Sequence, residues 1–123
     1  MHETSIAYGL VKILLAEAER NHVTQIAKVT IKVGKLKAVE PQSLQFCFDM
    51  FVEDTIAAGA ELIIDHLVTI ARCKSCFHEF EVPAFKFQCT RCSCSDLTII
   101  QGEELFIESF EVSSNNQQGQ NYV

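Results

Sequence analysis

Cysteine is the residue type that most constrains this chain. Six cysteines occur in 123 residues, and five of them are crowded between positions 73 and 94. Four of these five form two CxxC pairs, Cys73–Cys76 and Cys89–Cys92. Each pair places two thiolates on one tight turn, and two such turns can close the tetrahedral four-sulfur shell that Zn²⁺ favours. We therefore predict a structural zinc site with Cys73, Cys76, Cys89 and Cys92 as its ligands.

The spacing leaves some alternatives open. Iron also binds four thiolates, and a disulfide framework is the default for a secreted chain of this size. Cys94 could replace Cys92 as the fourth ligand, and His78 could either exchange for a thiolate or be an exposed loop histidine. Cys47 is separate from this cluster and lies on the apolar face of a predicted helix, so we interpret it as a buried, inert cysteine.

Composition excludes several classes of protein. With 48% hydrophobic and 21% charged residues, the chain has globular proportions, and no apolar run approaches the roughly 20 residues of a membrane helix. The net charge of −6 has the wrong sign for a protein whose main task is to bind the phosphate backbone of a nucleic acid. His2 and Glu3 stand where a secretory signal would be basic. We therefore expect a cytoplasmic protein with reduced thiols, without nucleic-acid or membrane partners.

The hydrophobic pattern predicts an α+β fold, in which a small sheet with two helices carries an inserted zinc-ribbon-like module with two CxxC knuckles. Residues 3–21 and the stretch from Pro41 to about residue 52 have helical periodicity, whereas residues 26–34, 61–68 and 105–112 read as strands. The predicted buried positions of the first helix are Ile6, Leu10, Ile13, Leu14 and Ala18. Those of the first strand are Ala27, Val29, Ile31 and Val33, and those of the second helix are Leu44, Cys47, Phe48, Phe51 and Val52.

These elements predict a discontinuous domain organisation. Residues 1–68 form an α/β domain that the returning strand within 103–112 completes, and residues 69–102 form the zinc module. Residues 113–123 are rich in Asn, Gln and Ser and are expected to form a flexible tail.

The segment Met1-His2-Glu3 has two interpretations. It can simply begin a helix, with an acidic residue favouring the helix dipole and an exposed histidine. It can also bind a metal, because a free α-amine, the backbone nitrogen of His2 and its ring nitrogen form fused chelate rings. The amide nitrogen of Glu3 can complete a square of nitrogens, which selects Cu(II) or Ni(II). Because amine and imidazole must be deprotonated, such binding should weaken in acid.

A family resemblance favours the second interpretation. The chain combines the Met1-His2-Glu3 start, the stretch Val33-Gly34-Lys35-Leu36, and the double CxxC with twelve residues between the pairs. Gly102-Glu-Glu-Leu105 then leads into Glu108-Ser-Phe-Glu111. In this order the motifs resemble the HypA/HybF family of nickel-insertion accessory proteins for [NiFe]-hydrogenase maturation, over residues 1–112. Two features depart from the family pattern: Thr90 stands where proline is frequent, and Cys94 is an additional thiol.

The resemblance implies a metallochaperone and not an enzyme. Nickel would bind at Met1, His2 and Glu3 as transient cargo, and zinc would bind structurally at Cys73, Cys76, Cys89 and Cys92. The implied partners are the GTPase HypB and the hydrogenase large-subunit precursor, with urease maturation proteins as a further option. Monomer and homodimer are both compatible with the sequence.

Two further classes of function compete with this one. One is a zinc-ribbon module that binds nucleic acid or another protein and has no nickel function. Residues 69–102 contain four Lys/Arg and three Asp/Glu, and this balanced charge is poorly suited to binding a phosphate backbone. The other is a small enzyme, but no catalytic set of residues can be placed at one site from spacing, and a closed thiolate shell leaves no position for a reacting water.

Overall fold

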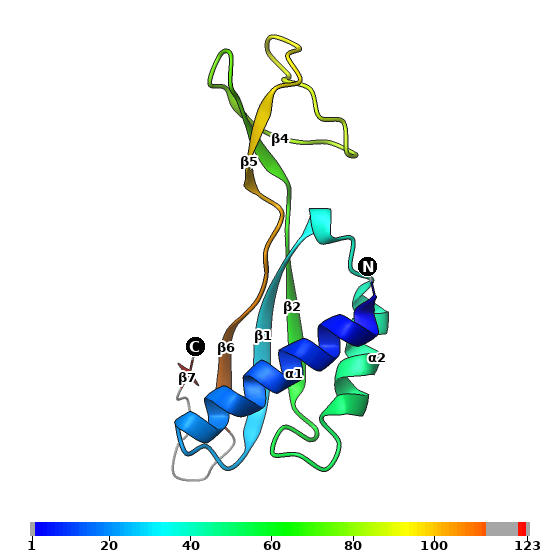
Figure 1. Ribbon diagram of the computed structural model, residues 1–123, viewed down its shortest axis with the longest axis vertical. Coiled ribbons are helices and arrows are strands. Elements are labelled where there is room, and N and C mark those ends of the chain that lie inside the picture. The colour runs from blue at the N-terminus through cyan, green and yellow to red at the C-terminus, as the bar shows by residue number, and fades with distance from the viewer. Residues whose placement is uncertain (1, 113–120, 123) are drawn as a thin grey trace. The chain divides into compact units, whose positions relative to one another are not determined.

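The computed structural model describes residues 2–112 and 121–122, and of the last two residues only the backbone. The predicted α+β class is confirmed (Figure 1). The elements in chain order are α1 (Glu3–Arg20), β1 (Ile26–Gly34), the 3₁₀ turn η1 (Lys35–Lys37), α2 (Pro41–Phe51), β2 (Glu61–Leu67), β3 (Ile70–Cys73), β4 (Glu79–Glu81), β5 (Leu97–Gln101), β6 (Leu105–Val112) and β7 (Asn121–Tyr122). Within the part of the chain that the structure describes, neither α-helix combines the length and the apolar character that a membrane span requires.

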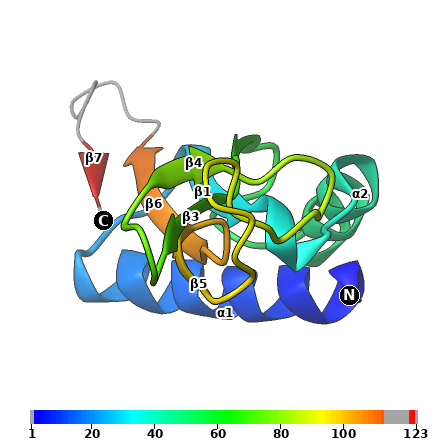
Figure 2. The same cartoon turned by 90° about the horizontal axis from the view of Figure 1, so that it is seen from above.

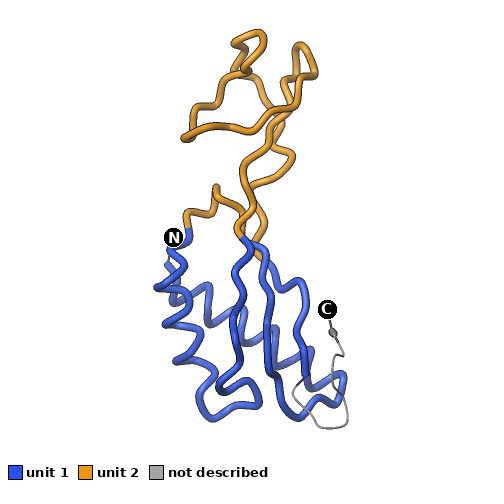
Figure 3. Tube along the Cα trace, turned by 180° about the vertical axis from the view of Figure 1, so that it is seen from behind, with its two compact units in different colours: residues 1–32, 39–65, 106–123 blue, residues 33–38, 66–105 orange. Residues whose placement is uncertain are grey.

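The chain divides into two compact units, coloured separately in Figure 3. The first comprises Met1–Lys32, Val39–Asp65 and Phe106–Val123, and the second comprises Val33–Ala38 and His66–Leu105. Two segments far apart in sequence therefore build the second unit.

The first unit is a sheet in the strand order β2-β1-β6-β7 with two helices packed against each other. Figures 1 and 2 show α1 running along one face of this sheet. Pro41 occupies the first turn of α2, and the Glu40 carboxylate caps the helix by accepting from the Ser43 N–H at 2.5 Å. The largest fully buried side chains of this unit are Phe48, Phe110, Leu14, Ile26, Ile31, Leu44, Val29 and Val52.

The predicted buried face of α1 is partly wrong. Leu10, Leu14 and Ala18 are buried as expected, but Ile13 is 57% exposed. Ala7 and Val11 take part in the buried stripe instead, at the i+3, i+4 and i+7 spacings that place them on one helix face with Leu14 and Ala18. The buried stripe is therefore rotated away from Ile13 and toward Ala7 and Val11.

One predicted inward position in β1 is also wrong, and the rest are confirmed. Val29, Ile31 and Val33 are buried, whereas Ala27 is exposed and Ile26 is buried in its place. The Ile26 N–H donates to the carbonyl of Ile56 at 2.8 Å, outside the strand ladder, so the regular alternation begins only later in the strand.

The second unit contains a three-stranded antiparallel sheet in the order β4-β3-β5. Its small core consists of Ala71, Cys73, Phe80, Val82 and Cys89, with Leu97 and Ile99 packed against it. The segment Val33–Ala38 belongs to this unit because the Leu36 N–H donates to the Gly102 carbonyl at 2.9 Å and the Gly34 N–H donates to the Glu104 carbonyl at 2.8 Å.

Most of the predicted tail lies outside the described residues. Residues 113–120 and 123 are not described, and Asn121–Tyr122 form β7, which pairs antiparallel with β6 opposite Glu111 and Phe110.

Candidate metal centres

The structure brings the four cysteines of the two CxxC pairs together. Their Sγ atoms all lie within 4.8 Å of one another, and the pairs Cys73–Cys92 and Cys76–Cys89 are 3.5 and 3.6 Å apart. In a tetrahedral zinc site with Zn–S bonds of about 2.3 Å, the sulfurs stand about 3.8 Å apart. The four thiols therefore fit one tetrahedral metal ion. We refer to them below as the four-cysteine group.

Backbone N–H groups of each CxxC turn point at the first sulfur of the pair. The Cys73 Sγ accepts from the N–H groups of Ser75 and Cys76 at 3.4 and 3.5 Å. The Cys89 Sγ accepts in the same way from Arg91 and Cys92, both at 3.4 Å. These donors stabilise negative charge on sulfur, as a metal-bound thiolate requires.

The pKa values of the first thiol in each CxxC pair agree with this geometry. The pKa of Cys73 is lowered to about 6, chiefly by the Cys76 N–H, against the opposing effect of burial. Burial also acts to raise the pKa of Cys89, but the N–H groups of Cys92 and Arg91 outweigh it and the pKa is lowered. Both turns are thus prepared to hold a thiolate.

Burial differs among the four cysteines. Cys73 and Cys89 are buried in the core of the second unit, Cys76 is half-buried and Cys92 is exposed. The donor set consists of sulfur alone, and all four tetrahedral positions would be occupied by protein. Such a closed shell suits a structural ion, because it leaves no position for substrate or water.

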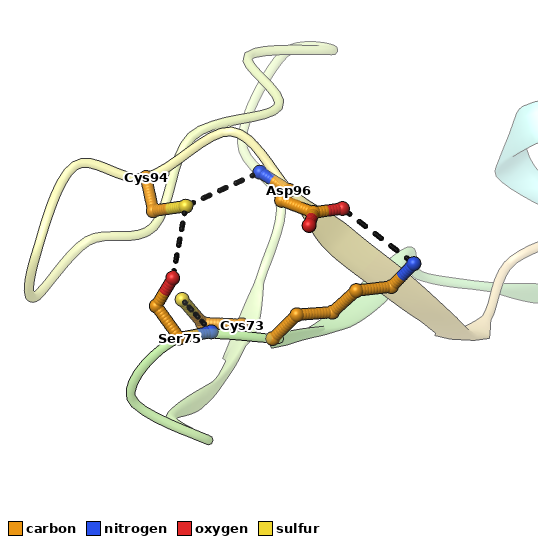
Figure 4. A network of polar contacts seen from close by, with 5 residues as sticks. Cys73, Ser75, Cys94 and Asp96 are labelled. Carbon is orange, nitrogen blue, oxygen red and sulfur yellow. Dashed lines mark hydrogen bonds and ion pairs between the residues drawn. The ribbon is translucent and has the colours of Figure 1, made fainter.

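The alternative ligands named from the sequence lie outside the four-cysteine group. The Cys94 Sγ accepts from Ser75 Oγ at 3.3 Å and from the Asp96 N–H at 3.4 Å (Figure 4). His78 stacks on the ring of Phe80, with 5.7 Å between centroids, and its Nε2 is 3.1 Å from Thr90 Oγ1.

Cys47 lies in the first unit. Its side chain is only 8% exposed on α2, and its sulfur is 3.4 Å from Thr4 Oγ1.

The start of α1 is exposed and carries the second predicted metal position. His2 is the N-cap residue of α1 with an extended backbone (φ −91°, ψ 105°), and its carbonyl accepts the first helical hydrogen bond, from the Ile6 N–H at 3.1 Å. The His2 side chain is exposed. Met1, the third residue of the prediction, lies outside the described residues.

Glu3 is held by the start of the other helix. Its Oε2 accepts from the Glu40 N–H at 2.9 Å, and this bond is the main reason that the pKa of Glu3 is lowered. Glu3 and Glu40 line an open cleft of about 520 Å³ together with Thr4, Ser43 and Cys47. No sequence pattern connects Glu40 with Glu3, because they are far apart in the chain and their contact depends on how α1 and α2 pack.

Known proteins resemble this chain over nearly its whole length. The family model described as hydrogenase/urease nickel incorporation, metallochaperone, hypA matches residues 1–112. A hydrogenase maturation factor HypA from Desulfitobacterium hafniense is 41% identical over 112 residues, which cover 91% of this chain and 98% of the relative. The factor of the same name from Desulfosudis oleivorans is 43% identical over 115 residues, with the same two coverages of 91% and 98%. The solution structure of the Ni metallochaperone HypA from Helicobacter pylori matches with a TM-score of 0.68 and 26% identity, over 94% of this chain and 100% of that one.

Proposed function

The chain belongs to the HypA family of hydrogenase/urease nickel-incorporation metallochaperones, and we propose that it carries Ni(II) on Met1-His2-Glu3 and delivers it to the [NiFe]-hydrogenase large-subunit precursor. The observation that carries this proposal is the exposed His2 at the start of α1, directly before a carboxylate that the fold holds in place.

The backbone at this position suits nickel binding. The first N–H groups of an α-helix have no partner within the helix, so the amide nitrogens of His2 and Glu3 can bind a metal without breaking a helical bond. Together with the Met1 amine and the His2 ring, they offer four nitrogens in fused chelate rings, the square arrangement that suits Ni(II). The ionised Glu3 carboxylate adds negative charge beside the cation.

An exposed position at a chain end suits cargo that must leave again. The acceptor can approach His2 from solvent and replace the nitrogen ligands one at a time. Because the amine and the imidazole bind only when deprotonated, acidification favours release. The sequence contains no GxxxxGKS or GxxxxGKT loop, so nucleotide hydrolysis in the cycle has to come from a partner, for which we propose the GTPase HypB. Proteins of urease maturation are a second proposed recipient.

We propose that the four-cysteine group holds Zn(II) as a structural ion. When bound, zinc supplies folding free energy by linking the two CxxC turns. The residues around it stabilise the thiolates through backbone N–H groups, and Cys73 and Cys89 exclude water from the inner side of the shell. Thiols kept as metal ligands also support the proposed cytoplasmic location.

The charges of the zinc module support metal delivery over nucleic-acid binding. Of its four cations, Arg72 pairs with Glu79 at 2.5 Å and Lys74 with Asp96 at 3.5 Å. These two pairs offset half of the module's positive charge, which leaves less of it for a phosphate backbone.

Nickel titration tests the proposal. Calorimetry with NiCl₂ on protein with its native N-terminus should give one tight site per chain, and His2→Ala or an N-terminal extension should abolish it. His66→Ala is the matched control, because it removes another exposed histidine and should leave nickel binding unchanged. Zinc content, measured by atomic absorption, should be equal in all four proteins. Equal nickel binding by His2→Ala or by the extended protein would exclude the N-terminal site.

A further inference from the structure

Cys94 is a fifth thiol that lies against the four-cysteine group without belonging to it. Its half-buried side chain packs on the small core that contains Cys73 and Cys89. Ser75 connects its sulfur with that of Cys73, because the Ser75 N–H donates to Cys73 Sγ at 3.4 Å and Ser75 Oγ donates to Cys94 Sγ at 3.3 Å (Figure 4). A single residue therefore separates the Cys94 sulfur from a proposed zinc ligand.

Cys92 is the least protected member of the four-cysteine group. Cys73 and Cys89 are 0% and 3% exposed, and Cys76 is half-buried, whereas Cys92 is exposed. Its departure from a metal would disturb only the solvent side of the shell, since the other three sulfurs are anchored in or beside the core of the second unit.

The residue between the two thiols has an unfavourable backbone conformation. Ser93 has a φ of 66°, in the left-handed region that residues other than glycine rarely adopt. The turn is closed by the Ser93 N–H on the Cys89 carbonyl at 3.0 Å and by the Cys89 N–H on the Cys94 carbonyl at 2.8 Å. Relaxation of Ser93 to a negative φ would reorient Cys92 and Cys94 relative to each other while Cys89 keeps its place.

We propose that Cys94 is an alternative zinc ligand that can replace Cys92, while Cys73, Cys76 and Cys89 stay bound. The inference rests on the zinc site proposed above. In the exchange, the Cys94 sulfur gives up its proton and donates an electron pair to zinc. The Cys92 sulfur leaves with its own pair and takes up a proton.

The exchange keeps the number and charge of the thiolate ligands constant. A module that depends on its metal for folding loses structure when the shell falls to three ligands. With Cys94 as a replacement, the exposed Cys92 can leave the metal, and the shell stays closed. The module can then expose a free thiol at its surface and still retain its ion.

Cobalt(II) substitution tests this inference, because sulfur-to-cobalt charge-transfer absorption increases with the number of bound thiolates. Cys92→Ser should keep the four-thiolate absorption of the unaltered protein, and the double variant Cys92→Ser/Cys94→Ser should lose about one quarter of it, as one of four sulfurs is gone. Cys76→Ser is the matched control. No further cysteine lies within three residues after Cys76, so this variant should lose the same quarter although Cys94 is present.

A second measurement shows directly whether the Cys94 thiol is bound to the metal or free. Iodoacetamide followed by peptide mass spectrometry should alkylate Cys94 in the zinc-loaded unaltered protein and spare it in zinc-loaded Cys92→Ser, until a chelator removes the metal. The proposal is wrong if Cys92→Ser matches the double variant or binds no cobalt, or if Cys94 stays reactive in it. An unaltered protein that lacks a four-thiolate cobalt spectrum would instead disprove the zinc site itself.

Discussion

Gly34 has no room for a side chain, and its replacement by alanine should destabilise the second unit. A Cβ on Gly34 would lie 2.0 Å from both the carbonyl carbon and the oxygen of Gly102, and 2.6 Å from the backbone nitrogen of Glu103. All three contacts are with backbone, so the segment around Gly34 has to move away from the chain at Gly102. That movement breaks the two hydrogen bonds that hold the segment, from Gly34 to Glu104 and from Leu36 to Gly102.

The expected magnitude follows from these contacts. Two lost hydrogen bonds cost about 2 kcal/mol, and the residual crowding adds about 1–3 kcal/mol. Alanine recovers about 0.4–1 kcal/mol by restricting the unfolded chain. We therefore expect Gly34→Ala to lower the free energy of unfolding of the second unit by about 2–5 kcal/mol.

Gly9 provides the matched control. It lies inside α1, and a Cβ there would meet nothing within 4 Å, so Gly9→Ala should stabilise the protein by about 0.5–1 kcal/mol. Urea unfolding followed by circular dichroism gives the free energies, and hydrogen exchange of the Leu36 amide reports on the affected segment. A loss below about 0.5 kcal/mol in Gly34→Ala, with unchanged exchange at Leu36, would refute the argument.

Three further predictions address the core, the pH dependence and the metal. Leu14→Ala, at a side chain that is 0% exposed, should cost about 2–5 kcal/mol in urea unfolding, whereas Ile13→Ala, at one that is 57% exposed, should be nearly neutral; equal losses would contradict the rotated face of α1. The Glu40 N–H lowers the pKa of Glu3 below 4.5, the ordinary pKa of a glutamate. The stability from this contact should therefore be fully present above pH 4.5 and be lost as the pH falls through the lowered pKa of Glu3 in the folded protein. An NMR titration of the Glu40 amide checks this, and a midpoint at or above 4.5 would contradict it. Removal of zinc with a chelator should increase hydrogen exchange in β3–β5 while the amides of α1 stay protected, and unchanged exchange in β3–β5 would argue against a structural ion.

Local patterns in the sequence were sufficient for much of the fold. The CxxC spacing brings two thiols onto one turn without help from distant residues, so the four-cysteine group could be predicted, and the structure places its sulfurs together. The buried face of α2 also follows the predicted spacing, with Leu44, Cys47, Phe48 and Val52 buried and Phe51 partly so. In both cases the interaction that determines the structure acts within one or two turns of the chain.

Features that depend on packing between distant segments could not be predicted. In α1 apolar residues lie on more than one face, so periodicity alone did not show that Ala7 and Val11 would be buried and Ile13 exposed. The bond from the Glu40 N–H to Glu3 joins the starts of two helices, and no spacing rule relates these two positions. The close approach of Gly34 and Gly102 likewise becomes visible only when the two backbones are in place.

The two proposed metal positions differ in the way in which the backbone supports them. In the four-cysteine group, turn N–H groups donate to the sulfurs of Cys73 and Cys89, and the core of the second unit fixes both side chains. Little rearrangement is then needed to bind zinc, and its release would expose buried sulfur. At the start of α1 the His2 side chain is exposed and can exchange ligands with solvent or an acceptor, and the Glu3 carboxylate is held by the hydrogen bond from the Glu40 N–H. Slow release suits an ion that holds a module together, and fast exchange suits an ion that must be delivered. The distribution of buried and exposed donors therefore argues for zinc as the resident ion and nickel as the cargo.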